Sequence, residues 1–337
     1  MNSLVTGSTG FLGSWIVKLL LERGDRVRVL VRRDVPDLAE MGVEIIHCDL
    51  SETDKVSRAM EGIDCVYHAA ARPGIWGSAE DYFRDNVLAT RNIIEGCRLH
   101  EVPKLVFTSS PSVVIGDEDL EGVDESIPYA KSYLAQYPRT KAIAEREVLE
   151  ANDHRLMTCA LRPHLIWGPG DRHLIPRFLL RGKQGRLRIV GSGNNKVDTI
   201  YIEDAARAHL VAEEKLSKDS AVCGNVFFLS QEEPVVMFDW INRILSASGI
   251  PPVTKKIPAK LAYLVGFALE GIYTLFPMES EPPMTRFVAR QLSQSHYFDH
   301  KKAREILGFT PRYSMEEAYQ KTFESDYFRK LCQDIRV

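Results

Sequence analysis

A tyrosine and a lysine four residues apart could exchange a proton with a carbonyl or alcohol oxygen. Tyr137 and Lys141 have this spacing, which puts both side chains on one face of a helix expected at 138–151. A neighbouring ammonium favours the phenolate, so the spacing predicts a lowered pKa for Tyr137 and a role as general acid and base. Lys141 could also bond the ribose of a nicotinamide cofactor.

The spacing alone is weak evidence for a catalytic pair, because Tyr297 and Lys301 have the same spacing. The two pairs differ in context. Ser109 and Ser110 end an expected strand at 104–109, upstream of Tyr137, where a hydroxyl can bond the same substrate oxygen. Tyr297 lies in a late segment without such a partner, and we interpret it as a packed aromatic beside a surface lysine.

A glycine turn, Thr6-Gly7-Ser8-Thr9-Gly10-Phe11-Leu12-Gly13, follows an expected strand at 3–6 and opens an expected helix at 11–23. Glycines allow a tight turn and a close backbone approach, and the helix N-terminus favours an anion. A glycine triplet can also be a tight turn that binds nothing. Its place on the first strand of an alternating series favours a dinucleotide site made by Gly7, Ser8, Thr9, Gly10, Phe11, Leu12 and Gly13.

The second expected strand, 26–31, leads into Arg32 and Arg33. Two guanidiniums suit the 2′-phosphate of NADP(H), which we favour, whereas Asp34 keeps NAD(H) open. Asp49 and Leu50 follow the third strand and are expected at the adenine. Small residues follow the fourth strand and let the ribose and pyrophosphate pass closely: Ala69, Ala70 and Ala71.

The elements that carry these residues alternate. Expected strands at 43–47, 64–68 and 157–162 are separated by helical stretches near 52–60 and 80–99, the last with a core stripe of Phe83, Val87, Thr90 and Ile94. This order predicts an α/β fold, a Rossmann-type doubly wound parallel sheet with a smaller, irregular C-terminal region. We expect a dinucleotide-binding domain at 1–165, which includes the Tyr137/Lys141 helix. A substrate-binding region and lid is expected at 166–337, with about 196–230 returning to the main sheet.

Bulk composition narrows the class of protein. The chain has 337 residues, 45% hydrophobic and 26% charged, and its net charge of -3 argues against a nucleic-acid partner. The six cysteines are scattered without a CxxC pair, so we expect reduced thiols and no metal site. No signal peptide precedes the first strand, which predicts a cytoplasmic protein.

The segment 257–278 is apolar on all sides, and Glu270 is its only charge between Lys260 and Glu279. Such a helix is buried, binds a hydrophobic ligand or lies on a membrane. Gly266, Glu270 and Gly271 weaken a spanning helix. We favour a buried lid over an apolar substrate, with peripheral membrane contact as the alternative.

Taken together, several motifs resemble the extended short-chain dehydrogenase/reductase family over essentially the whole chain. They are TGSTGFLG, Asp49-Leu50, the HAAA run, Asn86, FTSS, Tyr137/Lys141, LRPHLIWGPGD, DTIYIEDAA and KKAREILGFTPRYSMEEA. The resemblance implies that Tyr137 is the general acid/base, Lys141 the ribose contact, Ser110 the substrate-oxygen partner and Asn86 a supporting residue. It also places Ser109, Pro163 and His164 at the cofactor and suggests a homodimer. Pro138 departs from the pattern, but proline is tolerated in the first turn of a helix.

Within this family the hydrophobic segment resembles 3β-hydroxysteroid and sterol-carboxylate dehydrogenases. The closer similarity is to bacterial 2-alkyl-3-oxoalkanoate reductases of long-chain olefin synthesis, through AARPGIW, TSSPSV, TKAIAE, LRPHLIWGPGDRHLIPR and PMTRFVARQL. It implies NADPH-dependent reduction of a 2-alkyl β-keto acid, and association with other enzymes of that synthesis. Candidate substrate contacts are Ser110 and Ser112, with cations for the carboxylate at His164, Arg172 and His173.

Three other functions remain open from the sequence. The first is a 3β-hydroxysteroid or sterol dehydrogenase that runs in the oxidative direction. The second is a sugar-nucleotide epimerase or dehydratase that keeps NAD bound, against which Arg32, Arg33 and the apolar segment argue. The third is a regulator that binds the dinucleotide without chemistry.

Overall fold

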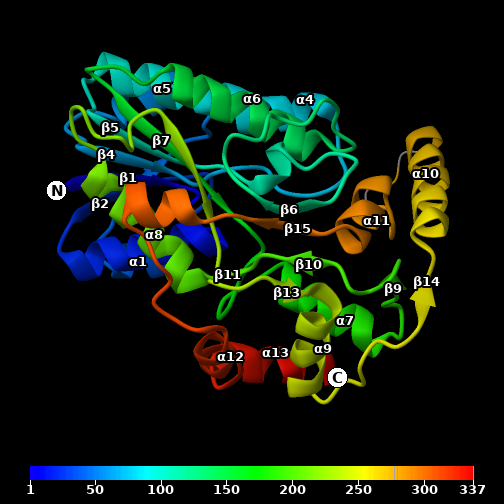
Figure 1. Ribbon diagram of the computed structural model, residues 1–337. Coiled ribbons are helices and arrows are strands. Elements are labelled where there is room, and N and C mark those ends of the chain that lie inside the picture. The colour runs from blue at the N-terminus through cyan, green and yellow to red at the C-terminus, as the bar shows by residue number, and fades with distance from the viewer. Residues whose placement is uncertain (277, 279, 337) are drawn as a thin grey trace.

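A seven-stranded, all-parallel sheet forms the centre of the protein (Figure 1). It is seen in a computed structural model that describes residues 1–276, 278 and 280–336. The strand order is β12-β7-β5-β4-β1-β2-β3. The strands are β1 (Asn2–Thr6), β2 (Arg26–Val31), β3 (Glu44–His47), β4 (Cys65–His68), β5 (Lys104–Thr108), β7 (Met157–Pro163) and β12 (Asn225–Leu229). The predicted doubly wound α/β fold is confirmed.

The chain order reverses direction across the sheet between β1 and β4. From β1 the strands proceed to β2 and β3 on one side, and from β4 they proceed to β5, β7 and β12 on the other. At such a switch point the loops after two adjacent strands diverge, and the crevice between them is the usual ligand site. The topology therefore places the glycine turn after β1 beside the alanine run after β4.

Helices cover both faces of the sheet (Figure 1). On one face lie α3 (Thr53–Arg58), α4 (Ala79–Tyr82), η1 (Phe83–Leu88), α5 (Ala89–Leu99) and α6 (Gln136–Glu150). On the other lie α1 (Phe11–Arg23) and α8 (Ile202–Lys215). The remaining helices are α2 (Pro36–Glu40), η2 (Pro111–Val113), α7 (Leu174–Lys183), α9 (Met237–Ala247), α10 (Ala259–Leu275), α11 (Arg286–Ser293), η3 (Ala303–Leu307), α12 (Met315–Phe323) and α13 (Asp326–Arg336).

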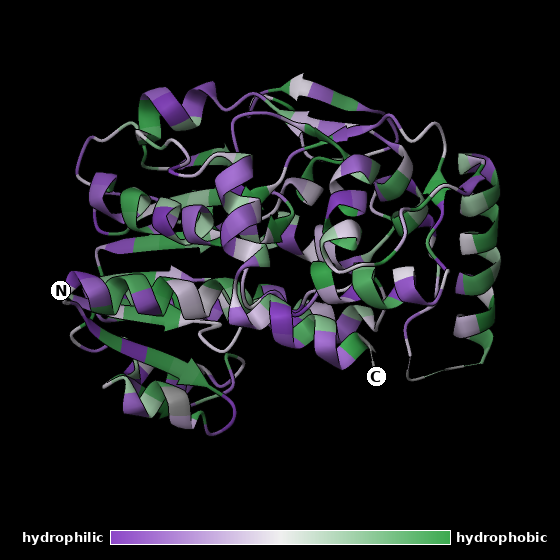
Figure 2. Ribbon diagram, turned by 90° about the horizontal axis from the view of Figure 1, so that it is seen from below, coloured by the Kyte–Doolittle hydropathy of each residue, from purple (hydrophilic) through white to green (hydrophobic). Residues whose placement is uncertain are grey.

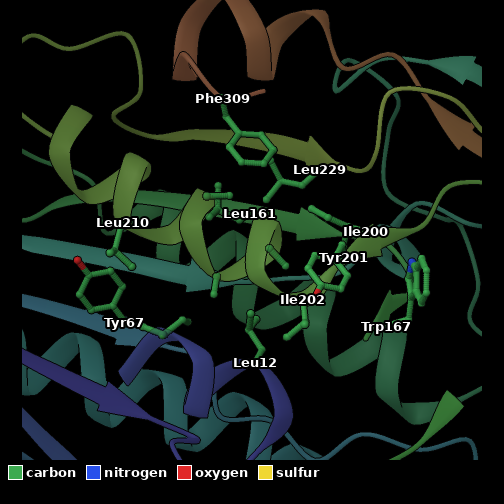
Figure 3. Packing of buried hydrophobic residues seen from close by; sticks show 14 of the residues in the cluster. Leu12, Tyr67, Leu161, Trp167, Ile200, Tyr201, Ile202, Leu210, Leu229 and Phe309 are labelled. Atoms are coloured by element: carbon green, nitrogen blue, oxygen red, sulfur yellow. The ribbon is translucent and has the colours of Figure 1, made fainter. Parts of the chain in front are cut away.

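Strand residues alternate between two hydrophobic cores. Along β1, Leu4 packs into the core under α3, α5 and α6, and Val5 packs into the core shared with α1 and α8. This alternation follows from the two-residue period of a strand, with both faces of the sheet covered. Figure 3 shows Leu12 pointing into the second core below Ile202. The side chain of Leu12 is therefore a core residue, which leaves its backbone at the start of α1 as the predicted cofactor contact.

The predicted single helix at 80–99 is interrupted. Its middle turn, η1, is a π-helix between α4 and α5. A π-turn holds more residues than an α-turn, so it shifts the face that the preceding residues present. Val87, Thr90 and Ile94 are buried as predicted, but Phe83 is 41% exposed. The predicted core stripe is wrong for Phe83.

Smaller sheets, built mostly from the second half of the chain, accompany the main one. A four-stranded sheet has the order β13 (Val235–Val236), β10 (Lys196–Val197), β15 (His296–Phe298) and β6 (Leu120–Val123). Two short parallel pairs are β8 (Ile166–Trp167) with β11 (Ile200–Tyr201), and β9 (Ile189–Val190) with β14 (Lys256–Ile257). Meanwhile β12 extends the main sheet beside β7.

Helix α10 stands at the margin of the molecule and packs on α11 (Figure 1). Only Ala262, Gly266 and Glu270 of α10 are buried, and most of its large apolar side chains are exposed. Figure 2 shows hydrophobic colour along much of this helix, at the margin of the molecule. The preferred prediction of a buried lid is therefore wrong for these side chains, and Pro277 of that segment lies outside the described residues. No helix among the described residues is long and apolar enough to cross a membrane.

Candidate active site

The glycine turn after β1 forms a backbone cradle. Gly7 has φ +70°, and a Cβ added there would lie 2.8 Å from the Ala70 nitrogen, in the loop after β4. A Cβ on Gly13 would lie 2.1 Å from the Gly7 carbonyl oxygen. Both contacts are with backbone, which cannot move aside as a side chain could. The close packing of turn, helix and neighbouring loop thus requires glycine at both positions.

The cradle opens into a cavity of about 380 Å³ at the switch point. No side chain caps the N-terminus of α1, and its first turn has no acidic residue, so its free N–H groups and dipole suit an anion. The buried hydroxyls of Ser8 and Ser109 have no partner among the described residues. The cavity is lined by Gly7, Thr9, Gly10, Leu30, Val31, Arg32, Cys48, Asp49, Leu50, Ala69, Ala70, Ala71, Arg72, Pro73, Asp85 and Ala89. These groups fit a dinucleotide.

The two arginines after β2 differ in position. Arg32 lines the cavity, and its guanidinium lies 3.9 Å from the carboxylate of Asp49. Arg33 is exposed and is absent from the cavity wall as described. Asp49 accepts hydrogen bonds from the backbone and hydroxyl of Ser51, which hold the pKa of its carboxyl below the usual value. Arg32 and an ionised Asp49 therefore lie side by side in the cavity wall.

Arg72 is a cavity residue that sequence reasoning missed. Its guanidinium pairs with Asp85 at 3.2 Å and with Asp81 at 3.5 Å, and it lies over the ring of Tyr82. These contacts fix the side chain beside the alanine run. The signal in the sequence was an arginine directly after that run, but its acidic partners come from α4 and η1 and could not be assigned by spacing.

Tyr137 lies in the first turn of α6, close to the end of β5. The hydroxyl of Ser110 hydrogen-bonds its phenol, and this bond lowers the phenol pKa, but burial has the larger effect and raises it overall. Ser110 also accepts hydrogen bonds from the backbone and hydroxyl of Ser112, at 3.2 and 3.0 Å. The structure thus brings Tyr137, Ser110 and Ser112 together, and it keeps the phenol protonated at neutral pH.

Lys141 lies one turn further along α6 and is 2% exposed. Its ammonium donates to the Thr108 carbonyl oxygen at 2.5 Å and lies 3.9 Å from the ring centre of Phe107. Burial lowers the pKa of Lys141 to about 7. The expectation that Lys141 lowers the pKa of Tyr137 is therefore wrong for the protein alone, because desolvation dominates at both groups.

Asn86 acts through other residues. It lies buried in η1, donates to the Thr140 hydroxyl at 2.9 Å and accepts from the Arg72 backbone at 2.6 Å. Thr140 lies between Tyr137 and Lys141 on α6. Asn86 is therefore a positioning residue that ties the catalytic helix to the loop after β4.

A buried chain of hydrogen bonds continues from Asn86 to the glycine turn. Thr90 donates to the Asn86 carbonyl at 2.7 Å and contacts one ring nitrogen of His68 at 3.0 Å. The other ring nitrogen lies 2.7 Å from the hydroxyl of Thr6, which accepts from the Ala70 backbone. Burial lowers the pKa of His68 to about 3, so this histidine is a neutral link. Sequence reasoning missed it, because His68 reads as part of a strand.

A buried ion pair anchors the other end of the catalytic segment. Arg162 on β7 donates twice to Glu145 on α6, at 2.9 and 2.5 Å, and Tyr129 donates to the same carboxylate at 2.7 Å. Both charged side chains are at most 3% exposed. Glu145 comes one turn after Lys141, so this pair sets how α6 lies on the sheet.

The structure corrects the predicted role of His164. It follows Pro163 at the end of β7, but its ring is buried, 2.6 Å from the ring of His296 and against Phe298. Burial, with repulsion from His296 and His300, lowers the pKa of His164 well below its usual value. A buried neutral ring cannot hold a carboxylate as a cation. The prediction that His164 binds the substrate carboxylate is wrong, and its side chain faces His296 instead of a ligand.

The other two predicted cations lie elsewhere. Arg172 is exposed, and its guanidinium donates to the Thr9 carbonyl at 3.4 Å, so it borders the glycine turn. His173 is exposed where α7 begins, with its backbone held by the Asp171 carboxylate. Neither makes a described contact with Ser110 or Tyr137.

The arrangement supports transfer of a proton at one oxygen atom. A bound nicotinamide would supply or accept the hydride. Tyr137, kept protonated by burial, can donate its phenolic proton to a carbonyl oxygen, while Ser110 bonds the same oxygen. Lys141, one turn further along α6, can gain or lose a proton near neutral pH.

The buried ammonium of Lys141 should therefore lower the free energy of unfolding at neutral pH. Its pKa falls from 10.5 when exposed to about 7 in the fold, so the folded state binds fewer protons than the unfolded chain between these values. Stability contributed by this group rises with pH across that window. Lys141→Met should thus gain stability over wild type as pH falls from 10.5 to 7, by about 1.4 kcal/mol per pH unit at most, and then level off. Urea unfolding of both proteins from pH 6 to pH 10 measures the difference. A constant difference across this range would contradict the lowered pKa.

Comparison with known proteins agrees with this site. Residues 4–258 match the 3-beta hydroxysteroid dehydrogenase/isomerase family. The chain is 44% identical to the 2-alkyl-3-oxoalkanoate reductase of Shewanella oneidensis, over 95% of this chain and 85% of that protein. It is 45% identical to the reductase of the same name from Stenotrophomonas maltophilia, over 95% and 98%. It is also 33% identical to the decarboxylating sterol-4-alpha-carboxylate 3-dehydrogenase of Mus musculus, over 98% and 91%.

A solved structure shares the whole architecture. MoeE5 in complex with UDP-glucose and NAD is 26% identical, superposes with a TM-score of 0.74, and covers 98% of this chain and 99% of its own. The resemblance inferred from the motifs is confirmed. The chain belongs to the 3-beta hydroxysteroid dehydrogenase/isomerase family, and it is an oxidoreductase that works with a nicotinamide dinucleotide.

Proposed function

We propose that the protein reduces the 3-keto group of a hydrophobic 2-alkyl-3-oxoalkanoate to the 3-hydroxy acid, with NADPH as the hydride donor. The observation that carries this proposal is the similarity to two bacterial reductases of that name along nearly the whole chain. Tyr137, hydrogen-bonded to Ser110, would donate the proton to the substrate oxygen in this direction. Arg172 and His173 stay as proposed contacts for the substrate carboxylate.

The test follows oxidation of NADPH with a synthetic 2-alkyl-3-keto acid and, separately, with a 3-ketosteroid. Turnover of the keto acid at a much higher kcat/KM supports the proposal. Turnover of the steroid without the keto acid would overturn it and favour the second candidate, a steroid dehydrogenase. That candidate rests on the 33% identity to the mouse sterol dehydrogenase and on the family match.

Preference for NADPH over NADH is proposed from Arg32. The side chain is 70% exposed at the cavity, and its one partner in the described part of the chain is the Asp49 carboxylate at 3.9 Å, so it is available to a 2′-phosphate. Arg32→Ala should lower kcat/KM for NADPH by about tenfold or more, as expected for loss of a charge-assisted bond, and change the value for NADH little. The matched control is Arg33→Ala, which removes the neighbouring charge outside the described cavity wall. Equal losses with both cofactors, or a larger effect of Arg33→Ala, would contradict the assignment.

A further inference from the structure

Helix α10 exposes its large apolar side chains and buries an acidic one, the reverse of the usual arrangement. A surface helix normally buries its large apolar residues and exposes its charged ones. In α10 the buried positions are two small residues and one acid, Ala262, Gly266 and Glu270. The outer face carries Leu261, Leu264, Val265, Phe267, Ile272 and Leu275, each at least 44% exposed.

The inner contacts fix this orientation. A Cβ on Gly266 would lie 2.5 Å from the Thr285 carbonyl carbon, so the backbones of α10 and the start of α11 are in direct contact. Glu270 accepts from the backbone and side chain of Arg286, at 2.7 and 2.6 Å. Rotating α10 to bury its leucines would break this pair and force Glu270 into solvent. The apolar face is thus held outward by specific packing.

The exposed apolar surface is concentrated there. Of the 15 large hydrophobic side chains that are exposed in the described chain, eight lie between Leu261 and Met278. A contiguous apolar patch on a folded protein marks a partner or a membrane surface. Lys260 is the only charged residue exposed on α10 as described.

The base of α10 is positively charged. β14, which leads into α10, pairs with β9, and the Ile189 backbone donates to the Lys255 carbonyl. This pairing joins two segments rich in cations, and none of these cations has a carboxylate partner among the described residues. We call them the basic cluster: Lys183, Arg186, Arg188, Lys255, Lys256 and Lys260. The whole chain has a net charge of -3, so the cluster is a local concentration.

We propose that α10 lies flat in the headgroup region of an anionic phospholipid bilayer, with its outer face in the acyl boundary and the basic cluster on the phosphates. An apolar helix face bordered by lysines and arginines has the chemistry that binds such surfaces. Figure 1 shows α10 at the outer margin, free of the sheet layers.

Docking would also bring the loop after β4, which borders the dinucleotide cavity, close to the bilayer. Tyr273 of α10 packs edge-to-face on Trp76, with ring centres 6.2 Å apart. Trp76 belongs to the loop after β4, whose first residues, Ala69 to Pro73, line the dinucleotide cavity. A hydrophobic keto acid could then reach the site from the lipid phase. This last step rests on the proposed function, whereas the docking itself does not.

The test is flotation of the full chain with vesicles of phosphatidylcholine alone and with about one third phosphatidylglycerol. Three variants are compared with wild type: Leu264→Glu/Leu275→Glu on the outer face, Lys255→Glu/Lys256→Glu in the basic cluster, and Leu99→Glu as a control. Leu99 is 72% exposed on α5, comparable to Leu264 at 62% and Leu275 at 76%. NADPH binding in solution verifies that each variant is folded.

We expect wild type and Leu99→Glu to float with the anionic vesicles. Lys255→Glu/Lys256→Glu should bind at least about 30-fold more weakly, because each of the two lysines near an anionic surface contributes about 1 kcal/mol. Leu264→Glu/Leu275→Glu should bind at least about tenfold more weakly, because two large apolar side chains no longer enter the acyl boundary. Failure of wild type to bind vesicles would overturn docking. A second result would also overturn docking. If Leu264→Glu/Leu275→Glu had half the mass of wild type in light scattering and bound vesicles as well as wild type, α10 would be a contact between subunits. Vesicle binding without turnover of the keto acid would contradict the proposed function and leave docking standing.

Discussion

Tyr137→Phe should lower kcat for reduction by about 10²- to 10⁴-fold, the usual contribution of a positioned general acid. The substitution removes only the hydroxyl that delivers a proton to the carbonyl oxygen. The ring remains to pack in the first turn of α6, and Ser110 keeps its bonds with Ser112. Because the interaction is made with the reacting oxygen, kcat should fall while the Kd of NADPH, measured by its fluorescence, stays close to that of wild type.

The matched control is Tyr297→Phe. Tyr297 shares the tyrosine–lysine spacing, but it lies half-buried in β15, and its partner Lys301 pairs with Glu305 at 4.0 Å. Its phenol has no described hydrogen bond, so activity should be unchanged. If Tyr137→Phe kept its activity, another acid would have to deliver the proton.

Short sequence patterns are sufficient to predict the glycine turn and the Tyr137/Lys141 pair. Gly7 and Gly13 are required by contacts within one βα unit and the strand beside it, and Tyr137 and Lys141 share one helix face. Each of these relations is encoded in a few neighbouring residues. The order of strands then placed the glycine turn and Ala69–Ala71 at one switch point, because parallel strands bring their carboxyl ends together.

The errors arose where residues distant in sequence meet. From the sequence, His164 is expected to be a cation in a loop that binds the substrate carboxylate. In the structure it packs against His296 of β15, and burial keeps its ring neutral. Lys141 was expected to act on Tyr137, yet its environment is set by Thr108 and Phe107 of β5. Periodicity could not show that α10 faces outward either, since a helix apolar on every side has no stripe to orient it. Gly266 and Glu270 decide that orientation through α11.

Arg162→Met should destabilise the fold by about 3 to 5 kcal/mol, because it leaves Glu145 as an unpaired charge in the core. Glu145 would keep only the hydroxyl of Tyr129 as a partner. Urea unfolding measures the loss. The matched control is Arg91→Met, which breaks the pair between Arg91 and Glu147 on the outer side of α6. Arg91 is 45% exposed there, so we expect a loss under about 1 kcal/mol.

The pH dependence distinguishes an unpaired charge from a simple cavity. In Arg162→Met, burial without a cation should raise the pKa of Glu145 above its unfolded value, so the folded variant takes up a proton more readily than the unfolded chain. Its stability then falls as pH rises through that window, and the deficit against wild type shrinks at acidic pH. Glu145→Leu/Arg162→Met removes both charges and should recover most of the stability with no such pH dependence. Two results would contradict this account: a stability deficit that stays constant with pH, or a double variant as unstable as the single one. Either result would show that the pair stabilises the fold through its packing volume alone. Its charge would then have no separate effect on how α6 holds Tyr137 and Lys141.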